Sequence, residues 1–453
     1  SPPTKAREVR GMEADYRAGR MASRKLRMSP RASAYGRKYR VRYLLGLAPG
    51  PPLRYHLFSV ASCSPDNLTL TRSLVMDDLA STCPMRFFRE LPDPRAANVR
   101  HRLVDLLVMA LAAMLCDADG WDDIEDFVQV KADWLTEFLD LRHGVPSADT
   151  FRRVLSRLDP QAFEQCFLRW MQAVAQQSGG RLLAVDGKSI RRSFERGWDK
   201  IGMAHMVSVF CGRNGLSLAQ LKCAGKGNEL AAIRQLLGLV DLRGATVSLD
   251  AIGCQKDVAA QIVKAGGDYL LAVKENQKTL HHRLQVEMDD LIRRHFQGLW
   301  HDRHQETDAG HGRLETRQVW VTDQLGWLKQ AGDWPGLKSV VVVQAQREVI
   351  GQAATVERRY YITSLAPDAA ALGQAIRSHW GIENGLHHVL DVSFHEDESR
   401  IRRGHGAENM SRLRRIALNL LKRADPLTKR KSIKGRRKIA GWDHQFLLQL
   451  ITG

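Results

Sequence analysis

The spacing of apolar residues divides the chain into a helical part and a part with strands. From about residue 85 to 178, apolar residues recur every three or four positions, as on one face of a helix. From residue 181 onward, short apolar runs alternate with turn residues, which is typical of strands. We therefore expect a small all-helical domain over residues 85–178, followed by an α/β domain over residues 181–423. The clearest helical segments are Leu103–Leu115, Ile124–Phe138 and Thr150–Leu158.

The elements after residue 181 follow a definite order. Gly212–Gly215 lies between two apolar runs and is typical of a hairpin turn. The predicted order is strand, hairpin, helix, strand, helix, strand, which is that of an RNase H-like core. The predicted strands are residues 182–186, 206–210, 216–222, 246–250 and 268–273, and the predicted helices are residues 229–239 and 257–265.

A β-rich insertion separates this core from its last helix. Residues 275–367 contain one predicted helix and three predicted strands, after which a helix over residues 369–391 resumes the core. Three extra strands would disturb the strand order of the core, so we predict that they form a separate module beside it. The insertion's predicted elements are the helix 279–292 and the strands 314–321, 339–346 and 358–364.

The chain is strongly basic, with 68 lysines and arginines, 50 acidic residues and a formal net charge of +18. This excess favours a polyanionic partner, above all nucleic acid, over a basic surface that is only solvated. Two segments concentrate the charge. Residues 1–82 are expected to be a largely disordered basic extension, and residues 424–453 a basic C-terminal tail. Between Lys422 and Lys438 there are nine basic residues and one acid.

Cysteines and apolar runs indicate the setting. The seven cysteines are scattered and lack CxxC pairs or zinc spacing, which argues against a disulfide framework or zinc knuckle and fits a reducing cytoplasm. The longest apolar stretch, Leu103–Cys116, contains Asp105 and is too short to span a bilayer, so it is expected to be a buried helix. We expect a cytoplasmic, nucleoid-associated protein without membrane contact.

Three acidic residues occupy positions suited to binding metal ions. Asp186 and Asp250 each end an apolar run at the ends of predicted neighbouring strands, and Glu383 lies in a predicted helix. An aspartate after a strand is often only a turn former. Asp391, one turn beyond His387, is either a further acid of the same site or a structural one. Three such carboxylates can hold two Mg²⁺ or Mn²⁺ ions that activate water or a 3′-hydroxyl at a phosphodiester.

Polar residues near these acids are candidates for DNA contact. Lys188 follows Asp186 by two positions, and Lys274 and Asn276 follow the fifth predicted strand. For the lysines, simple solvation is the alternative. Asn384 is a further candidate beside Glu383. His387 is expected either to touch a DNA phosphate or to pair with a carboxylate.

Two arginines of the insertion are also candidates. Arg313 belongs to a His311–Gly312–Arg313 turn, and Arg317 lies on the strand that follows. Either could hold a DNA end during cleavage. The alternative is that Glu315 pairs with one of them and only holds a strand in place.

Several long motifs carry a resemblance to a known family. Over about residues 85–450 the chain resembles the bacterial DDE transposases of the H-repeat-associated (ISAs-type) insertion sequences. Two departures stand out: His388 occupies a position where the family usually has tryptophan, and residues 1–82 match nothing in the family. The motifs are Ala184–Lys188, Leu249–Lys256, Gly267–Gln277, Gly310–Arg317, Arg377–Asn384 and Asn409–Lys422.

The resemblance implies an RNase H-like catalytic domain with a β insertion, a preceding helical domain, and a catalytic triad of Asp186, Asp250 and Glu383. It also implies a DNA transposase that binds the terminal inverted repeats of an insertion sequence, cuts there with two Mg²⁺ and joins the 3′-hydroxyl to target DNA. We expect a homodimer in the active complex. Two alternatives are a stand-alone nuclease of the same fold and a domesticated DNA-binding protein that no longer cuts; the intact acids argue against the second.

Overall fold

The computed structural model describes residues 81–96, 99–175, 181–194, 203–223, 225, 227–310, 312–349, 351–424 and 430–452. Except for its last two residues, the expected extension over residues 1–82 lies outside these ranges. Within them, no helix combines the length and the apolar character needed to cross a bilayer.

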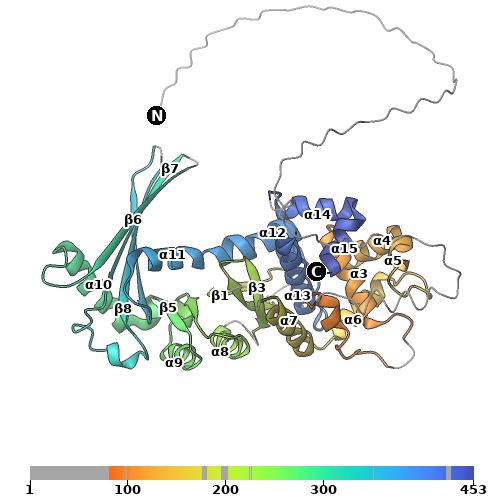
Figure 1. Ribbon diagram of the computed structural model, residues 1–453, viewed down its shortest axis with the longest axis horizontal. Coiled ribbons are helices and arrows are strands. Elements are labelled where there is room, and N and C mark those ends of the chain that lie inside the picture. The colour runs from red at the N-terminus through yellow and green to blue at the C-terminus, as the bar shows by residue number, and fades with distance from the viewer. Residues whose placement is uncertain are drawn as a thin grey trace, which may run out of the picture. The chain divides into compact units, whose positions relative to one another are not determined.

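Helices lie before and after the sheet. The predicted buried helix is confirmed as α3, whose residues are all buried except Val104. It packs against α4 and also against α13, α14 and α15, so the helical part draws on both ends of the described chain (Figure 1). The predicted helix at 124–138 is divided into α4 and α5. The helices are α2 (Pro84–Phe88), α3 (Leu103–Leu115), α4 (Trp121–Val130), α5 (Ala132–Thr136), α6 (Ala148–Arg157), α7 (Pro160–Ala175), α13 (Gly406–Arg423), α14 (Ile433–Trp442) and α15 (His444–Thr452).

The segment expected to be a basic tail folds into α14 and α15. Leu447 is fully buried, and so is Arg437. The Arg437 guanidinium donates to the Met114 carbonyl at 3.0 Å and lies 2.9 Å from an Asp117 carboxylate oxygen. Part of the basic charge counted in this segment therefore serves the protein interior and cannot reach a ligand.

Helix α13 brings charged side chains into the core. Arg412 Nε lies 2.7 Å from Glu164 Oε2 on α7, and Arg415 Nη1 lies 3.1 Å from Glu396 Oε1; each of these four side chains is at most 2% exposed. The second oxygen of Glu164 accepts the backbone N–H of Gln220 at 2.9 Å. Buried charges persist where ion pairs compensate them. The Arg412–Glu164 pair joins α13 to α7, and the hydrogen bond from Gln220 extends this contact to the sheet.

One sheet of nine strands, in the order β3-β2-β1-β4-β5-β9-β8-β7-β6, forms the α/β part. β1 and β4 are parallel, as are β4 and β5, and the other pairs are antiparallel. The first five strands form the RNase H-like core. Helices α8 (Glu229–Leu239) and α9 (Lys256–Lys264) lie on one face and α11 (Ala369–His379) on the other (Figure 1). The core strands are β1 (Arg181–Ser189), β2 (His205–Cys211), β3 (Leu216–Lys222), β4 (Ala245–Leu249) and β5 (Asp268–Val273).

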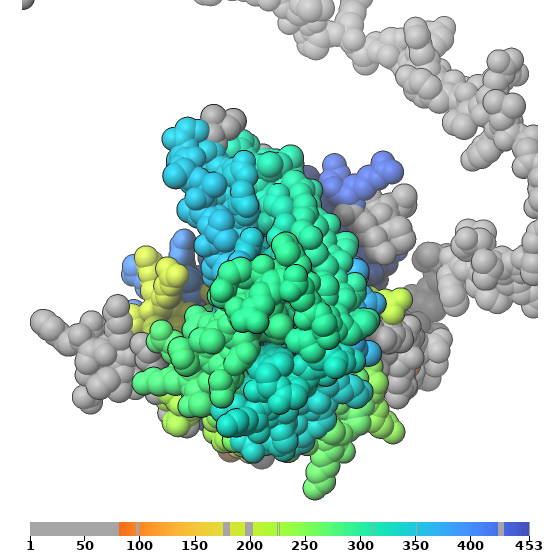
Figure 2. All heavy atoms as spheres, turned by 90° about the vertical axis from the view of Figure 1, so that its left-hand side faces the viewer, coloured from red at the N-terminus to blue at the C-terminus, as the bar shows by residue number. Residues whose placement is uncertain are grey.

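The insertion extends this sheet, so the prediction of a separate module is wrong. β9 pairs antiparallel with β5, with Leu271 opposite Ile362, and β8, β7 and β6 follow as antiparallel neighbours. The core order survives because the new strands add at the free edge of β5. Figure 2 shows this side of the molecule, which the insertion largely covers in green to cyan. Its elements are α10 (Lys278–Arg293), β6 (Asp302–Gly310), β7 (Arg313–Thr322), β8 (Ser339–Val349) and β9 (Thr355–Thr363).

Candidate active site

The three acids predicted to bind metal line one cavity of about 450 Å³. Asp186 lies on β1, and Asp250 follows β4 directly. Since Val185 pairs with Leu249 in the parallel β1–β4 ladder, the two aspartates leave adjacent strands at the same level. Glu383 approaches from the helical segment after α11. The structure therefore brings together carboxylates from three elements that are far apart in sequence.

Negative charge is concentrated around Asp186. Burial, together with the nearby charges of Asp250, Glu383 and Glu229, raises the pKa of Asp186 to about 7, although a hydrogen bond from the Gly187 N–H opposes this shift. Asp250 is held by its own turn, where it accepts the Ile252 N–H at 3.1 Å. Carboxylates crowded in this way repel one another unless protons or cations neutralise them.

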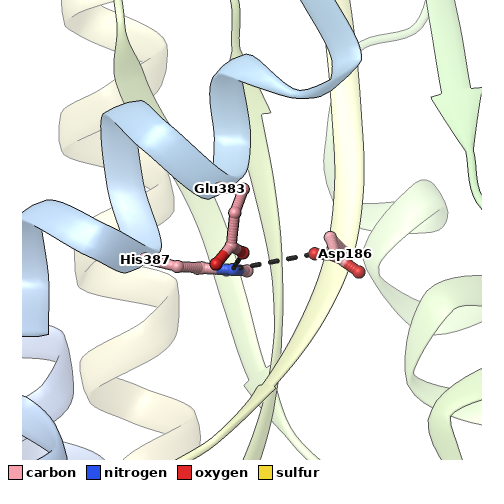
Figure 3. A group of neighbouring side chains, drawn as sticks. All are labelled: Asp186, Glu383 and His387. Carbon is pink, nitrogen blue, oxygen red and sulfur yellow. Dashed lines mark hydrogen bonds and ion pairs between the residues drawn. The ribbon is translucent and has the colours of Figure 1, made fainter. Parts of the chain in front are cut away.

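His387 lies between two of the acids. Its Nδ1 is 3.0 Å from Glu383 Oε2 and 3.6 Å from Asp186 Oδ2 (Figure 3). The side chain is 4% exposed. Of the two roles expected for His387, pairing with a carboxylate is the one that the structure shows. Burial lowers the pKa of His387, while the hydrogen bond to Glu383 opposes this shift.

The predicted helix over residues 369–391 is interrupted where it carries Glu383. α11 ends at His379, a π-helical turn spans Glu383–His387, and α12 runs from His388 to Phe394. The His388 N–H donates to the Glu383 carbonyl, five residues back. Turns of this kind are rare and frequently occur at functional sites.

Lys422 of α13 supports this turn from the protein interior. Its Nζ donates to the Gly385 carbonyl at 2.7 Å and to the Gly215 carbonyl, and it lies 4.9 Å from the centre of the Phe210 ring. Burial lowers the pKa of Lys422 to about 8. The sequence pattern counted Lys422 in a basic segment and at the end of the family motif Asn409–Lys422, but gave it no role, so its contact with the turn was missed.

Lys188 connects the strand of Asp186 to the helix after Glu383. Its Nζ lies 2.7 and 2.6 Å from the two carboxylate oxygens of Asp391 and 3.3 Å from Asp397 Oδ1. Its side chain is 9% exposed. Asp391 is therefore paired with a lysine and is not one of the acids that face the cavity.

The other predicted contact residues divide into exposed and engaged ones. Lys274 is exposed and lines the same cavity as the acids. Asn276 is close by, but its amide donates to the Ala251 carbonyl. Asn384 is exposed and lines a larger groove of about 1120 Å³ over the inserted strands. Trp380 borders both spaces, with the Arg359 guanidinium 4.7 Å from its ring centre.

The two insertion arginines differ in their surroundings. Arg317 pairs with Glu315 and lies 3.4 Å from both Glu306 and Asp308, so the predicted alternative of an arginine held by Glu315 is present. Arg313 is exposed at the start of β7. The preceding His311 lies outside the described residues.

The fold and the acids define a class of protein: an RNase H-like α/β protein with a cluster of carboxylates beside the core strands. Comparison with known families agrees. A family model described as "Transposase DDE domain" matches residues 177–420, and its companion "DDE_Tnp_1-associated" matches residues 85–171. The chain belongs to the DDE transposase family.

Relatives from Escherichia coli share most of their length with this chain. "Putative transposase YncI" of strain O157:H7 is 41% identical over 77% of this chain and 90% of its own length. "H repeat-associated putative transposase YhhI" of strain K12 is 36% identical over 80% of this chain and 96% of its own. A solved piggyBac transposase synaptic complex with hairpin DNA matches with a TM-score of 0.38 and 10% identity, over 85% of this chain and 80% of that one, which is too distant to bear on the fold.

Proposed function

We propose that the protein is an active DNA transposase that binds the terminal inverted repeats of an insertion sequence, cleaves there and joins the 3′-hydroxyl to target DNA. The observation that carries this proposal is the meeting of Asp186, Asp250 and Glu383 in one cavity beside the central strands of the RNase H-like core. A folded protein keeps such crowded acids only at a cost in stability, which a bound cation offsets.

The donor set fits divalent ions. Carboxylate oxygens are preferred ligands of Mg²⁺ and Mn²⁺. The raised pKa of Asp186 reflects its burial and the acids around it, a cost that a bound cation would offset. Asp186 and Asp250 would bridge or share two such ions, and Glu383 would complete their coordination. When bound, such ions activate the attacking oxygen and stabilise the leaving oxygen at a phosphodiester.

Exposed basic and polar residues are assigned to hold DNA. Lys274 at the cavity, Asn384 on the groove and Arg313 at the start of β7 are exposed. The net charge of +18 supports binding to the phosphate backbone of double-stranded DNA, both at the transposon ends and at the target. Four further residues have polar groups that already contact protein, and we propose that they support the DNA-binding surface by fixing the segments that form it. They are Lys188, Asn276, Arg317 and His387. A homodimer would hold two ends together.

The test is a cleavage and joining assay with DNA that carries the element's ends, in Mg²⁺ or Mn²⁺. Asp186→Ala, Asp250→Ala and Glu383→Ala should each abolish both products and leave duplex binding largely unchanged, because the acids serve the chemistry and basic residues supply the affinity. Asp257→Ala is the matched control, since Asp257 is an exposed carboxylate paired with Arg234 outside the site.

The alternatives give different results in the same assay. Cleavage without joined product would indicate a stand-alone nuclease. Binding with no metal-dependent cleavage by the unaltered protein would indicate a domesticated DNA-binding protein. Cleavage at the unaltered rate by any one acid variant would remove that residue from the proposed triad.

A further inference from the structure

We propose that His387 is a fourth ligand of the catalytic metal site and binds, through its ring nitrogen, the ion held between Asp186 and Glu383. This inference rests on the proposed function and goes beyond the three-carboxylate site. It makes the two ion positions chemically different. One would have a nitrogen ligand, and the other, between Asp186 and Asp250, would have oxygen ligands alone.

The spacing of the donor atoms supports one shared ion. Asp186, Glu383 and His387 each offer a ligand atom within 4.8 Å of the other two. The Nδ1 of His387 is 3.0 Å from Glu383 Oε2 and 3.6 Å from Asp186 Oδ2. With metal–oxygen bonds of 2.0–2.1 Å, adjacent ligands of an octahedral ion are about 3 Å apart. The three side chains thus converge as in Figure 3 with little further movement required.

The burial of His387 supports the same role. Its side chain is 4% exposed, and Nδ1 is the ring nitrogen that faces the two acids. A neutral imidazole that carries its proton on Nε2 has its lone pair on Nδ1, where it can reach an ion held by Asp186 and Glu383.

The main-chain conformation around the histidine is also unusual. Glu383 and His387 are the first and last residues of the π-helical turn, which Lys422 supports through the Gly385 carbonyl at 2.7 Å. π-Helical turns often aim side chains at functional sites. Because imidazole suits transition metals better than it suits Mg²⁺, this position should favour Mn²⁺ over Mg²⁺.

The alternative is a purely structural role, in which His387 only hydrogen-bonds to Glu383 and fixes its rotamer. Activity cannot separate the two roles, because either one would be damaged by substitution. Direct detection of a nitrogen ligand can. We therefore choose a measurement on the whole protein with Mn²⁺ alone, without DNA.

The experiment is pulsed electron paramagnetic resonance of bound Mn²⁺, which detects nuclear coupling from a coordinated histidine nitrogen. The unaltered protein should show ¹⁴N coupling that changes to ¹⁵N coupling when histidine is ¹⁵N-labelled. His387→Gln should lose the coupling and bind Mn²⁺ at least tenfold more weakly, since even indirect partners of metal ligands change affinity by about 10–100-fold.

Two histidine variants are matched controls. His388→Gln changes the exposed neighbour in sequence, and His379→Gln changes a histidine that lines the cavity but whose Nδ1 lies 2.9 Å from Ser248 Oγ. Both should keep the coupling. If His387→Gln fails to fold, the labelled unaltered protein and these two variants still decide whether a histidine binds and exclude His379 and His388.

The outcomes separate this inference from the proposed function. Mn²⁺ binding that is lost in Asp186→Asn but shows no histidine coupling overturns the inference and leaves the carboxylate site standing. Coupling that persists in His387→Gln, or that disappears in His379→Gln, also overturns it. Absence of any Asp186-dependent Mn²⁺ binding overturns the metal site of the proposed function and the inference together.

Discussion

Asp186 should destabilise the metal-free protein at neutral and alkaline pH, and replacing it by asparagine should stabilise the fold. Its pKa is raised from 3.8 to about 7 by burial and by the neighbouring acids. An acid that holds its proton more tightly in the folded protein than in the unfolded chain favours folding at low pH. That advantage is lost as the pH rises from about 4 through about 7.

The magnitude follows from the shift. A shift of about three pKa units, at about 1.4 kcal/mol each, destabilises the fold by about 4 kcal/mol at pH 8 relative to low pH. At pH 5, only slightly above the unfolded pKa, the destabilisation is about 1.5 kcal/mol. Solvent reaches the Asp186 side chain, which is 29% exposed, so these values are upper limits. Asp186→Asn has no proton to lose and stays uncharged at every pH. Its gain in unfolding free energy over the unaltered protein should therefore grow between pH 5 and pH 8.

The assay is urea unfolding of both proteins in EDTA at pH 5 and pH 8, followed by circular dichroism. At pH 8 the variant should unfold at higher urea than the unaltered protein, and added Mg²⁺ should stabilise only the unaltered protein, because the ion binds the folded carboxylates. Asp257→Asn, at an exposed acid, should show no such advantage. Equal or lower stability of Asp186→Asn at pH 8 would refute the reasoning and show that the Asp186 carboxylate does not strain the metal-free fold.

Two further predictions concern ion pairs that support the site. Lys188→Met should raise the Mg²⁺ concentration needed for half-maximal cleavage, because it frees Asp391 and the helix after Glu383 from β1. The charge-exchanged double variant Lys188→Asp with Asp391→Lys should partly restore the original Mg²⁺ dependence. An unchanged Mg²⁺ dependence in Lys188→Met would show that the pair does not position Glu383. Arg412→Met should lower the free energy of unfolding by about 3–5 kcal/mol, because the Glu164 carboxylate stays buried without the arginine that pairs with it. Urea unfolding measures this loss, and a loss below about 1 kcal/mol would contradict the prediction.

Much of the catalytic core was predictable because the spacing of apolar residues changes clearly between its strands and its helices. The strands at 216–222 and 268–273 and the helix at 229–239 have the bounds expected from the sequence. The cavity acids were predictable from family resemblance and from the apolar runs before Asp186 and Asp250, although β1 continues past Asp186 to Ser189 and so Asp186 is not at the strand end. The continuous helix over residues 369–391 was not, because a π-helical turn depends on a distant support, Lys422, that apolar spacing does not reveal.

Charge was the least informative signal. β6 is almost entirely polar, and its acids Glu306 and Asp308 pair with Arg377 of α11, so the strand has no apolar alternation to recognise. Arg412 and Arg415 are also fully buried, although in a sequence they look like the exposed basic residues that bind DNA. A count of lysines and arginines cannot distinguish a cation in the interior from one on a surface.

The order of the elements along the chain also sets when catalysis becomes available during synthesis. A ribosome makes Asp186 and Asp250 early, but Glu383 follows only after the four inserted strands, and its turn is held by Lys422 of α13. Arg437 of α14 then packs 4.3 Å from the ring centre of Phe394 at the end of α12. While α13 and α14 have not yet left the ribosome, the turn that carries the Glu383 carboxylate therefore lacks the contacts that support it. If the protein has the proposed function, a partly made chain should therefore be unable to cut DNA until α13 and α14 are in place.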